Sequence, residues 1–198
     1  MIVILGESSS GKTTLAKMFV DANPKYKKVV TYTTRPMRDG EVDGVDYHFI
    51  SQEKFDEYVN NGFFVEHAKY RDWDYGIAKD DCNSKYSVAV LTPSGLRTLK
   101  KLKYDIKSIY VYVDRRSRLI SALARGDDIE EAYRRNLSDF GQFDGITEEV
   151  DYVIDNTMFH MDENQVLNCL YAVLNIKKQN DKFEQISVFD LGVLNERD

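Results

Sequence analysis

Hydrophobic residues follow two kinds of pattern along this chain, and together they predict alternating strands and helices. Short apolar runs, typical of strands buried on both faces, occupy residues 2–5, 28–33, 87–91, 108–113 and 150–154. Apolar residues at helical spacing occupy residues 94–102, 117–124 and 162–176, and a further helix is expected to begin near Lys12. This alternation predicts an α/β fold, with a parallel sheet core covered by helices on both faces in three layers.

Residues 46–70 interrupt the alternation. The stretches "DYHFI" and "FFVEHAKY" are typical of strands, and they flank a segment with one apolar helical face. Ser51 is a suitable N-cap for that helix, and Gly62 is suited to the position just beyond its end. We therefore expect a small α+β insertion on the parallel core.

The loop "GESSSGKTT" follows the first expected strand and fits the pattern G-x-x-x-x-G-K-[ST]. Small residues let the backbone curl so that its amides surround phosphate groups, and the following helix directs its positive end at the same anion. Lys12 would reach the outer phosphates, and the Thr13 hydroxyl would ligate Mg²⁺. The alternative, a Ser/Gly-rich turn, does not explain the strand before the loop and the helix after it. The expected phosphate-binding residues are Gly6, Glu7, Ser8, Ser9, Ser10, Gly11, Lys12, Thr13 and Thr14.

A second anion-binding stretch is predicted in "TYTTRPMRDGEVDGVDY", residues 31–47. Arg35 and Arg38 lie close together in a turn, with Tyr47 nearby. Two guanidinium groups beside a phenol suit a phosphate monoester, and Glu41 would hold an arginine in place. The alternative is a solvated charged loop, which is the usual role of such runs.

Glu66 stands inside an apolar strand pattern, where a carboxylate needs a partner. A purine edge that presents two N–H donors would supply one, and guanine has that edge whereas adenine does not. The alternative is a glutamate on a strand edge that faces water.

These stretches resemble the guanylate kinase family of P-loop nucleoside monophosphate kinases, over roughly residues 2–156. The resemblance is most specific in "TTRPMRDGEVDGVDYHF", in "FVEHAKY" and in the Tyr-Gly pair that follows. It implies ATP with Mg²⁺ as the donor and GMP or dGMP as the acceptor. It also implies that Arg35, Arg38, Tyr47 and Tyr75 bind the acceptor phosphate, that Thr31 and Glu66 face guanine, and that Glu41 supports the arginines.

The family carries arginines on a mobile lid, and "RRSRLISALARGDDIEEAYRRNLSDF" occupies that place here. Asp128 and Glu131 have the spacing of a capping box, which predicts the start of the second lid helix. Each of these arginines could instead be solvated surface. The resemblance implies catalytic roles for Lys12 and Arg125. Arg134 and Arg135 lie near a further family arginine, and the expected catalytic set adds Arg118 and Arg135.

The sequence departs from the family pattern at several positions. Two family arginines fall on Ser121 and Asn136, so Arg118 and Arg135 are expected to substitute for them. The family's Asp-x-Asp, which serves Mg²⁺ and the base, is replaced by Val90 and Thr92, and its Ser or Thr after Tyr-Gly is replaced by Ile77. These changes leave open what completes the Mg²⁺ site and how strictly guanine is preferred.

Composition narrows the classes further. The 198 residues carry a net charge of −6, which disfavours nucleic acid as a partner, and they include no apolar run of membrane-spanning length. Cys82 and Cys169 belong to no metal or redox motif, so a reduced, cytoplasmic setting is expected. We expect one domain over residues 1–198. Its parts are a core at 1–30, 81–116 and 146–176, a monophosphate-binding part at about 31–80, a lid at about 117–145, and a tail at 177–198. The sequence leaves open the role of the tail and the oligomeric state.

Three functional hypotheses follow. The first is a guanylate kinase that converts ATP and GMP or dGMP to ADP and the diphosphate. The second is a monophosphate kinase of the same architecture with an altered or broader base preference, suggested by Ile77 and Thr92. The third is a binding module that keeps the fold without turnover, which the intact Lys12–Thr13 pair disfavours.

Overall fold

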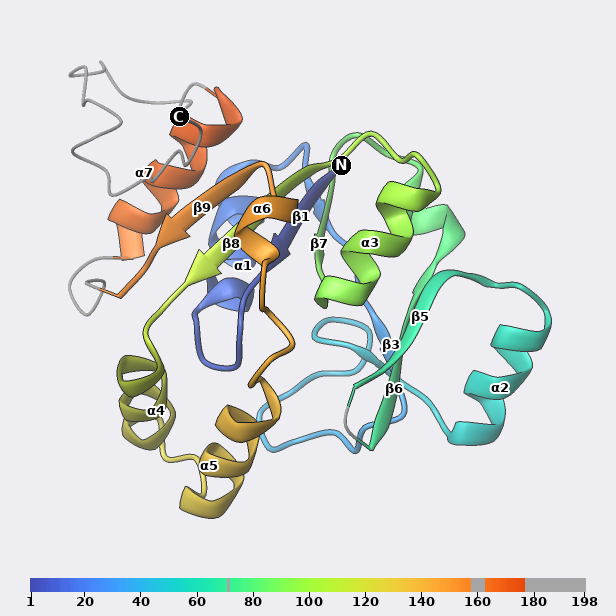
Figure 1. Ribbon diagram of the computed structural model, residues 1–198. Coiled ribbons are helices and arrows are strands. Elements are labelled where there is room, and N and C mark those ends of the chain that lie inside the picture. Colours follow the sequence, from blue (N-terminus) through green and yellow to red (C-terminus); the bar gives the residue numbers. More distant parts are fainter. Residues whose placement is uncertain (71, 158–162, 177–198) are drawn as a thin grey trace.

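A five-stranded parallel sheet forms the centre of the protein, as the computed structural model, which describes residues 1–70, 72–157 and 163–176, shows (Figure 1). Strand β1 (Ile2–Leu5) lies in the middle, hydrogen bonded to β7 (Ser87–Val90) on one side and β8 (Lys107–Tyr112) on the other. Strands β2 (Lys27–Lys28) and β9 (Tyr152–Asp155) complete the order β2-β7-β1-β8-β9.

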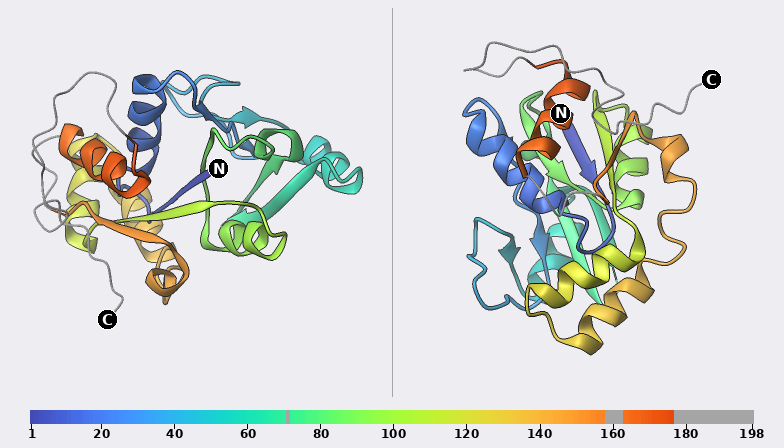
Figure 2. Two further views of the ribbon diagram at one scale, coloured as in Figure 1. Left: turned by 90° about the horizontal axis from the view of Figure 1, so that it is seen from above. Right: turned by 90° about the vertical axis from the view of Figure 1, so that its left-hand side faces the viewer.

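The two faces of this sheet bury two separate hydrophobic clusters. On one face Ile2 and Ile4 pack with α1 (Lys12–Ala22) and α7 (Glu163–Leu174). On the other face Val3 and Leu5 pack with α3 (Pro93–Lys101) and α6 (Ile146–Glu149). Figure 2 shows these helix pairs on opposite sides of the sheet. Because both faces are covered, every residue of β1 is buried, and the predicted three-layer α/β fold is confirmed.

The expected insertion is a second sheet, in the order β4-β3-β6-β5. It contains β3 (Tyr32–Thr33), β4 (His48–Phe49), β5 (Phe64–Tyr70) and β6 (Trp73–Ala78), and the short helix η1 (Lys79–Cys82) leads from it back to the central sheet. Helix α2 (Gln52–Asn60) begins as predicted, because the Ser51 hydroxyl accepts a hydrogen bond from the Lys54 amide.

The prediction of one strand over residues 28–33 was wrong. Lys28 pairs with Val88 of the central sheet, whereas Tyr32 pairs with His48 and Gly76 of the small sheet. An unbroken apolar run does not reveal that the chain changes sheets within it, because both sheets use residues of the same kind. Strand β6 was not anticipated, since "WDYGIA" combines a charge and a glycine with its apolar residues.

Helices α4 (Arg115–Ala124) and α5 (Ile129–Ser138) lie at the carboxyl ends of the parallel strands, on the same side as the small sheet (Figure 1). The Asp128 carboxylate accepts from the Glu131 amide at 2.9 Å, which confirms the predicted start of the second helix. Among the described residues, no helix is long and apolar enough to cross a membrane.

Candidate phosphoryl-transfer site

A cavity of about 610 Å³ opens between the central sheet, the small sheet and the α4–α5 pair. The structure brings most of the site residues predicted from sequence to its walls. Gly6, Ser8, Ser9, Lys12 and Thr13 come from the phosphate loop, Arg125 and Arg135 from the α4–α5 pair, and Thr31, Arg35, Arg38, Glu41, Tyr47, Glu66 and Tyr75 from the small sheet and its loops.

The phosphate loop has the conformation that its glycines allow. Gly11 adopts φ 84°, a left-handed conformation, and is the N-cap of α1. A Cβ on Gly6 would lie 2.8 Å from the Val111 carbonyl oxygen, so only glycine fits where β1 enters the loop. The Lys12 ammonium donates to the Glu7 carbonyl at 2.9 Å and reaches back over the loop. Lysine and loop amides therefore lie at the carboxyl end of the sheet, where a phosphate would bind.

Glu41 orients the paired arginines of the small sheet. Its carboxylate accepts from the Arg35 guanidinium at 2.6 Å and from the Arg38 backbone amide at 2.8 Å. Burial acts to raise the pKa of Glu41, but the hydrogen bonds from Arg35 and Arg38 outweigh it and lower that pKa. The Arg35 side chain is buried and lies over the Tyr47 ring, 5.2 Å from its centroid. The expected support of the arginines by Glu41 is thus present as a direct contact.

Positive charges meet in this cavity from two sides. The pKa of Arg38 is lowered first by burial and then by the charges of Arg35, in the loop after β3, and of Arg135 on α5. Like charges held together in a partly buried space repel each other, and an anion between them removes that cost. The arrangement is suited to a phosphate group.

Glu66 is 6 % exposed, and burial raises the pKa of its carboxyl to about 7. No hydrogen bond to this carboxylate is found within residues 1–70, 72–157 and 163–176. It lies against Gly95 of α3, where an added Cβ would come within 3.1 Å of the carboxyl carbon. Ile77, its cross-strand partner, is fully buried and lines the same cavity. A buried acceptor without donors is therefore available to a ligand.

The arginines of the α4–α5 pair fall into two groups. Arg125 and Arg135 line the cavity, and both form ion pairs with Asp127, at 2.7 and 3.0 Å. Arg125 also donates to the Ser9 hydroxyl of the phosphate loop at 3.4 Å. Arg118, expected to act beside them, is instead buried in ion pairs with Glu7 and Asp139, and its side chain does not line the cavity.

A second cavity, of about 300 Å³, lies on the other side of the phosphate loop. Ser10, Gly11 and Thr14 border this space instead of the first cavity. Asn156 at its edge donates to the Ser10 carbonyl at 3.0 Å, while its buried Oδ1 has no hydrogen-bond partner among the residues that the structure describes. Asn156 was not predicted as a site residue, although a polar residue directly after a parallel strand occupies the edge where α/β proteins bind ligands.

Thr13 is the side chain that the phosphate loop presents as a ligand for Mg²⁺. No group of three or more His, Cys, Asp or Glu residues within the described part of the chain could hold a metal ion. Thr92 caps α3, with its hydroxyl accepting from the Gly95 amide at 3.2 Å. Mg²⁺ keeps several waters and binds readily through substrate phosphates, so one threonine hydroxyl fits an ion that arrives with a nucleotide.

A phosphate loop at the carboxyl end of a parallel sheet, with a second cluster of arginines lining the same cavity, defines a P-loop protein with two places suited to phosphate groups. The sequence model of the guanylate kinase family matches residues 1–172. The chain is 33% identical over 163 residues to the guanylate kinase of Rhodopseudomonas palustris (strain ATCC BAA-98 / CGA009), with 79% of this chain and 74% of the relative covered. It is 28% identical over 203 residues to that of Legionella pneumophila (strain Lens), with 97% and 95% covered.

The fold also matches the crystal structure of guanylate kinase from Anaplasma phagocytophilum. The TM-score is 0.66 at 24% sequence identity, with 91% of this chain and 87% of that chain covered. At this identity the likeness shows a common fold. The family match and the sequence relatives go further: the chain belongs to the guanylate kinase family.

Proposed function

We propose that this protein transfers the γ-phosphate of ATP to GMP or dGMP, which yields ADP and the corresponding diphosphate. The observation that carries the proposal is the shared cavity, which is lined by Lys12 and Thr13 of the phosphate loop, by Arg35 and Arg38, and by Glu66 of β5. The family relatives named as guanylate kinases support the same reaction.

On the donor side, the phosphate loop would bind the ATP phosphates. The Lys12 ammonium, now on the Glu7 carbonyl, would turn to the outer phosphates, and the Thr13 hydroxyl would hold Mg²⁺. Mg²⁺, when bound, neutralises charge on the phosphates. The second cavity adjoins the loop, has Asn156 among its lining residues, and is a candidate site for the adenine base.

On the acceptor side, Arg35, Arg38, Tyr47 and Tyr75 would bind the monophosphate, with Arg35 oriented by Glu41. The Glu66 carboxylate would accept from the two N–H donors on the guanine edge, and Thr31 lines the same cavity. The acceptor phosphate would then face the γ-phosphate of ATP in line.

The α4–α5 pair would act as a lid over both substrates. Arg125 and Arg135 would neutralise charge on the transferred phosphoryl group, and closure would exclude water. The pair also reaches the small sheet, because the Arg134 guanidinium lies 5.8 Å from the centroid of the Trp73 ring. We place the reaction in the cytoplasm, where ATP and nucleoside monophosphates are available.

One observation favours a second candidate, a kinase with a broader base preference. Ile77 adds no hydrogen-bonding group beside Glu66, and the Thr92 hydroxyl caps α3. A lost polar contact costs about 1–3 kcal/mol, so discrimination between bases would fall by roughly one to two decades.

A coupled assay of ADP release, with ATP–Mg²⁺ and a panel of ribo- and deoxynucleoside monophosphates, tests these candidates. We expect GMP and dGMP to be the best acceptors, ahead of AMP. Comparable rates with several bases would favour the second candidate. Nucleotide binding without turnover on any acceptor would support a non-catalytic binding module instead.

A further inference from the structure

A buried network of charged side chains joins two neighbouring residues of the phosphate loop. The Glu7 carboxylate accepts from the Tyr110 hydroxyl at 2.7 Å and pairs with the Arg118 guanidinium at 3.5 Å. The same guanidinium pairs with Asp139 at 3.4 Å, and Asp139 in turn accepts from the Ser8 backbone amide at 2.8 Å. Glu7 and Ser8 are thus held from both sides by residues from β8, from α4 and from the end of α5.

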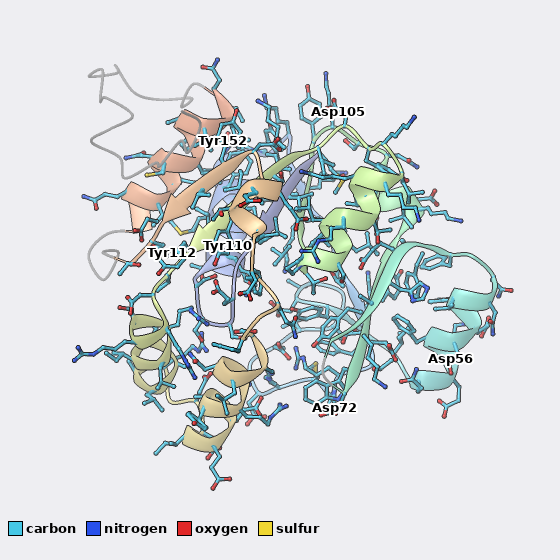
Figure 3. All side chains as sticks on the ribbon, in the orientation of Figure 1. Asp56, Asp72, Asp105, Tyr110, Tyr112 and Tyr152 are labelled. Atoms are coloured by element: carbon cyan, nitrogen blue, oxygen red, sulfur yellow. The ribbon has the colours of Figure 1, made fainter. Side chains whose placement is uncertain are left out.

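This network is more deeply buried than Arg125, the arginine at the end of α4 that lines the cavity. The side chains of Asp139, Arg118 and Glu7 are 1%, 7% and 12% exposed, whereas that of Arg125 is 57% exposed. Arg118 further donates through Nε to the Val113 carbonyl at 3.0 Å, so its position is fixed by groups on three sides. Figure 3 labels Tyr110 on β8, and its pKa is raised first by burial and then by its hydrogen bond to Glu7.

Glu7 also connects the network to Lys12. The Lys12 ammonium donates to the Glu7 backbone carbonyl, so a shift of the Glu7 peptide moves the group expected to reach the ATP phosphates. In addition, Glu7 places a negative charge within the phosphate loop itself. Without the Arg118 charge beside it, this carboxylate would repel a nucleotide phosphate.

We propose that Arg118 and Asp139 are positioning residues for ATP, which hold the Glu7–Ser8 segment of the phosphate loop against the base of the α4–α5 pair and neutralise Glu7. The role rests on the proposed use of ATP as donor, but not on the identity of the acceptor. It differs from that of a catalytic arginine, because Arg118 would act on the loop instead of touching the transferred phosphoryl group.

Equilibrium binding of ATP–Mg²⁺ by calorimetry, together with steady-state kinetics, tests this role in the full chain. The variants are Arg118→Met, Asp139→Ala, Asp139→Asn, Tyr110→Phe and the double variant Arg118→Met/Asp139→Ala. The matched control is Arg97→Met, because Arg97 forms an ion pair with Glu149 of α6 at 2.6 Å, is 50% exposed and lines neither cavity. Circular dichroism establishes that each variant is folded.

We expect Arg118→Met and Asp139→Ala each to weaken ATP binding about tenfold or more while leaving the KM for the acceptor nearly unchanged. The double variant should lose no more than about the larger single loss, since the residues act as one unit. Asp139→Asn keeps an acceptor for the Ser8 amide and should recover much of the affinity. Tyr110→Phe removes one hydroxyl, should fold normally, and should weaken ATP binding by a smaller factor.

Unchanged ATP affinity in folded Arg118→Met, Asp139→Ala and Tyr110→Phe would overturn the inference. A loss of kcat in Arg118→Met with ATP affinity intact would also overturn it and would assign Arg118 to the transition state. Because ATP binding is measured without an acceptor, these results stand even if GMP proves not to be the substrate.

Discussion

Glu66 of β5 and Ile77 of β6 are cross-strand partners, and both side chains border the same cavity. The pair combines a buried carboxylate with a fully apolar neighbour. At this position, where the base of the acceptor would bind, the pair thus offers one strong hydrogen-bond acceptor. Base preference should therefore depend chiefly on the protonation state of Glu66.

The KM for GMP should rise as the pH falls below about 7. Burial raises the pKa of Glu66 to about 7, and a protonated carboxyl cannot accept from both guanine N–H groups. Kinetics from pH 5.5 to 8.5 measure this, with Glu66→Gln as the control, since GMP's own phosphate titrates equally with both proteins. Identical pH profiles for wild type and Glu66→Gln would show that Glu66 does not contact the base.

The titration of Glu66 should also make the free energy of unfolding depend on pH. The pKa of Glu66 is about 7 in the folded protein, against an ordinary value of 4.5. The folded state therefore favours the protonated carboxyl, and the stability that this contributes is complete below pH 4.5 and is lost as the pH rises through 7. For the unliganded protein this loss is on the order of 3 kcal/mol at most. Urea unfolding at pH 5 and pH 8 should show a larger decrease for wild type than for Glu66→Gln.

Ile77→Ser should lower the KM for GMP and also lower the melting temperature. The hydroxyl would add a polar contact beside Glu66, while loss of a fully buried side chain costs about 2–5 kcal/mol. Ile77→Ala removes similar bulk without the hydroxyl and is the matched control. If Ile77→Ala lowers the KM as much as Ile77→Ser, the gain comes from space and not from hydrogen bonding.

Lys12→Ala should abolish phosphoryl transfer while leaving the fold intact. The Lys12 ammonium lies on the phosphate loop at the cavity wall, where it donates to the Glu7 carbonyl. The coupled assay measures the rate, and Lys17→Ala on the exposed side of the same helix is the control. A kcat near that of wild type in Lys12→Ala would contradict the proposed reaction.

Arg38→Ala should raise the KM for the monophosphate by about tenfold or more, with the KM for ATP nearly unchanged. Arg38 lies on the acceptor side of the cavity, and its amide is bound by Glu41. Lys54→Ala, which breaks an exposed ion pair with Glu57 on the neighbouring α2, should change neither constant. Equal effects of Arg38→Ala on both substrates would argue that these arginines do not bind the acceptor.

Arg134→Ala should shift tryptophan fluorescence to longer wavelength. Trp73 is the single tryptophan of the chain, and the Arg134 guanidinium covers its half-buried ring. Bound ATP analogue and GMP together should shift wild-type emission the opposite way, because a closed lid shields the ring from water. Emission that responds neither to the substitution nor to the nucleotides would show that α5 does not close on the β5–β6 pair that carries Trp73.

The sequence by itself determined the features that depend on residues close together along the chain. The strand–loop–helix of the phosphate loop and the N-caps at Ser51 and Asp128 depend on groups within a few positions of each other, so their spacing predicts them. Only the tertiary structure decided which sheet each part of residues 28–33 joins, because pairing depends on strands far along the chain.

The dependence on distant residues also explains why the sequence did not predict the contacts of Arg118. Sequence placed it one helical turn from a family arginine, but its ion pairs are with Glu7 and Asp139, and Asp139 binds the Ser8 amide across 131 positions. Asn156 reaches Ser10 across 146 positions in the same way. Spacing cannot encode such contacts, since they arise only when packing of the sheet and helices brings distant side chains together and burial makes each charge pair with whatever opposite charge lies nearest.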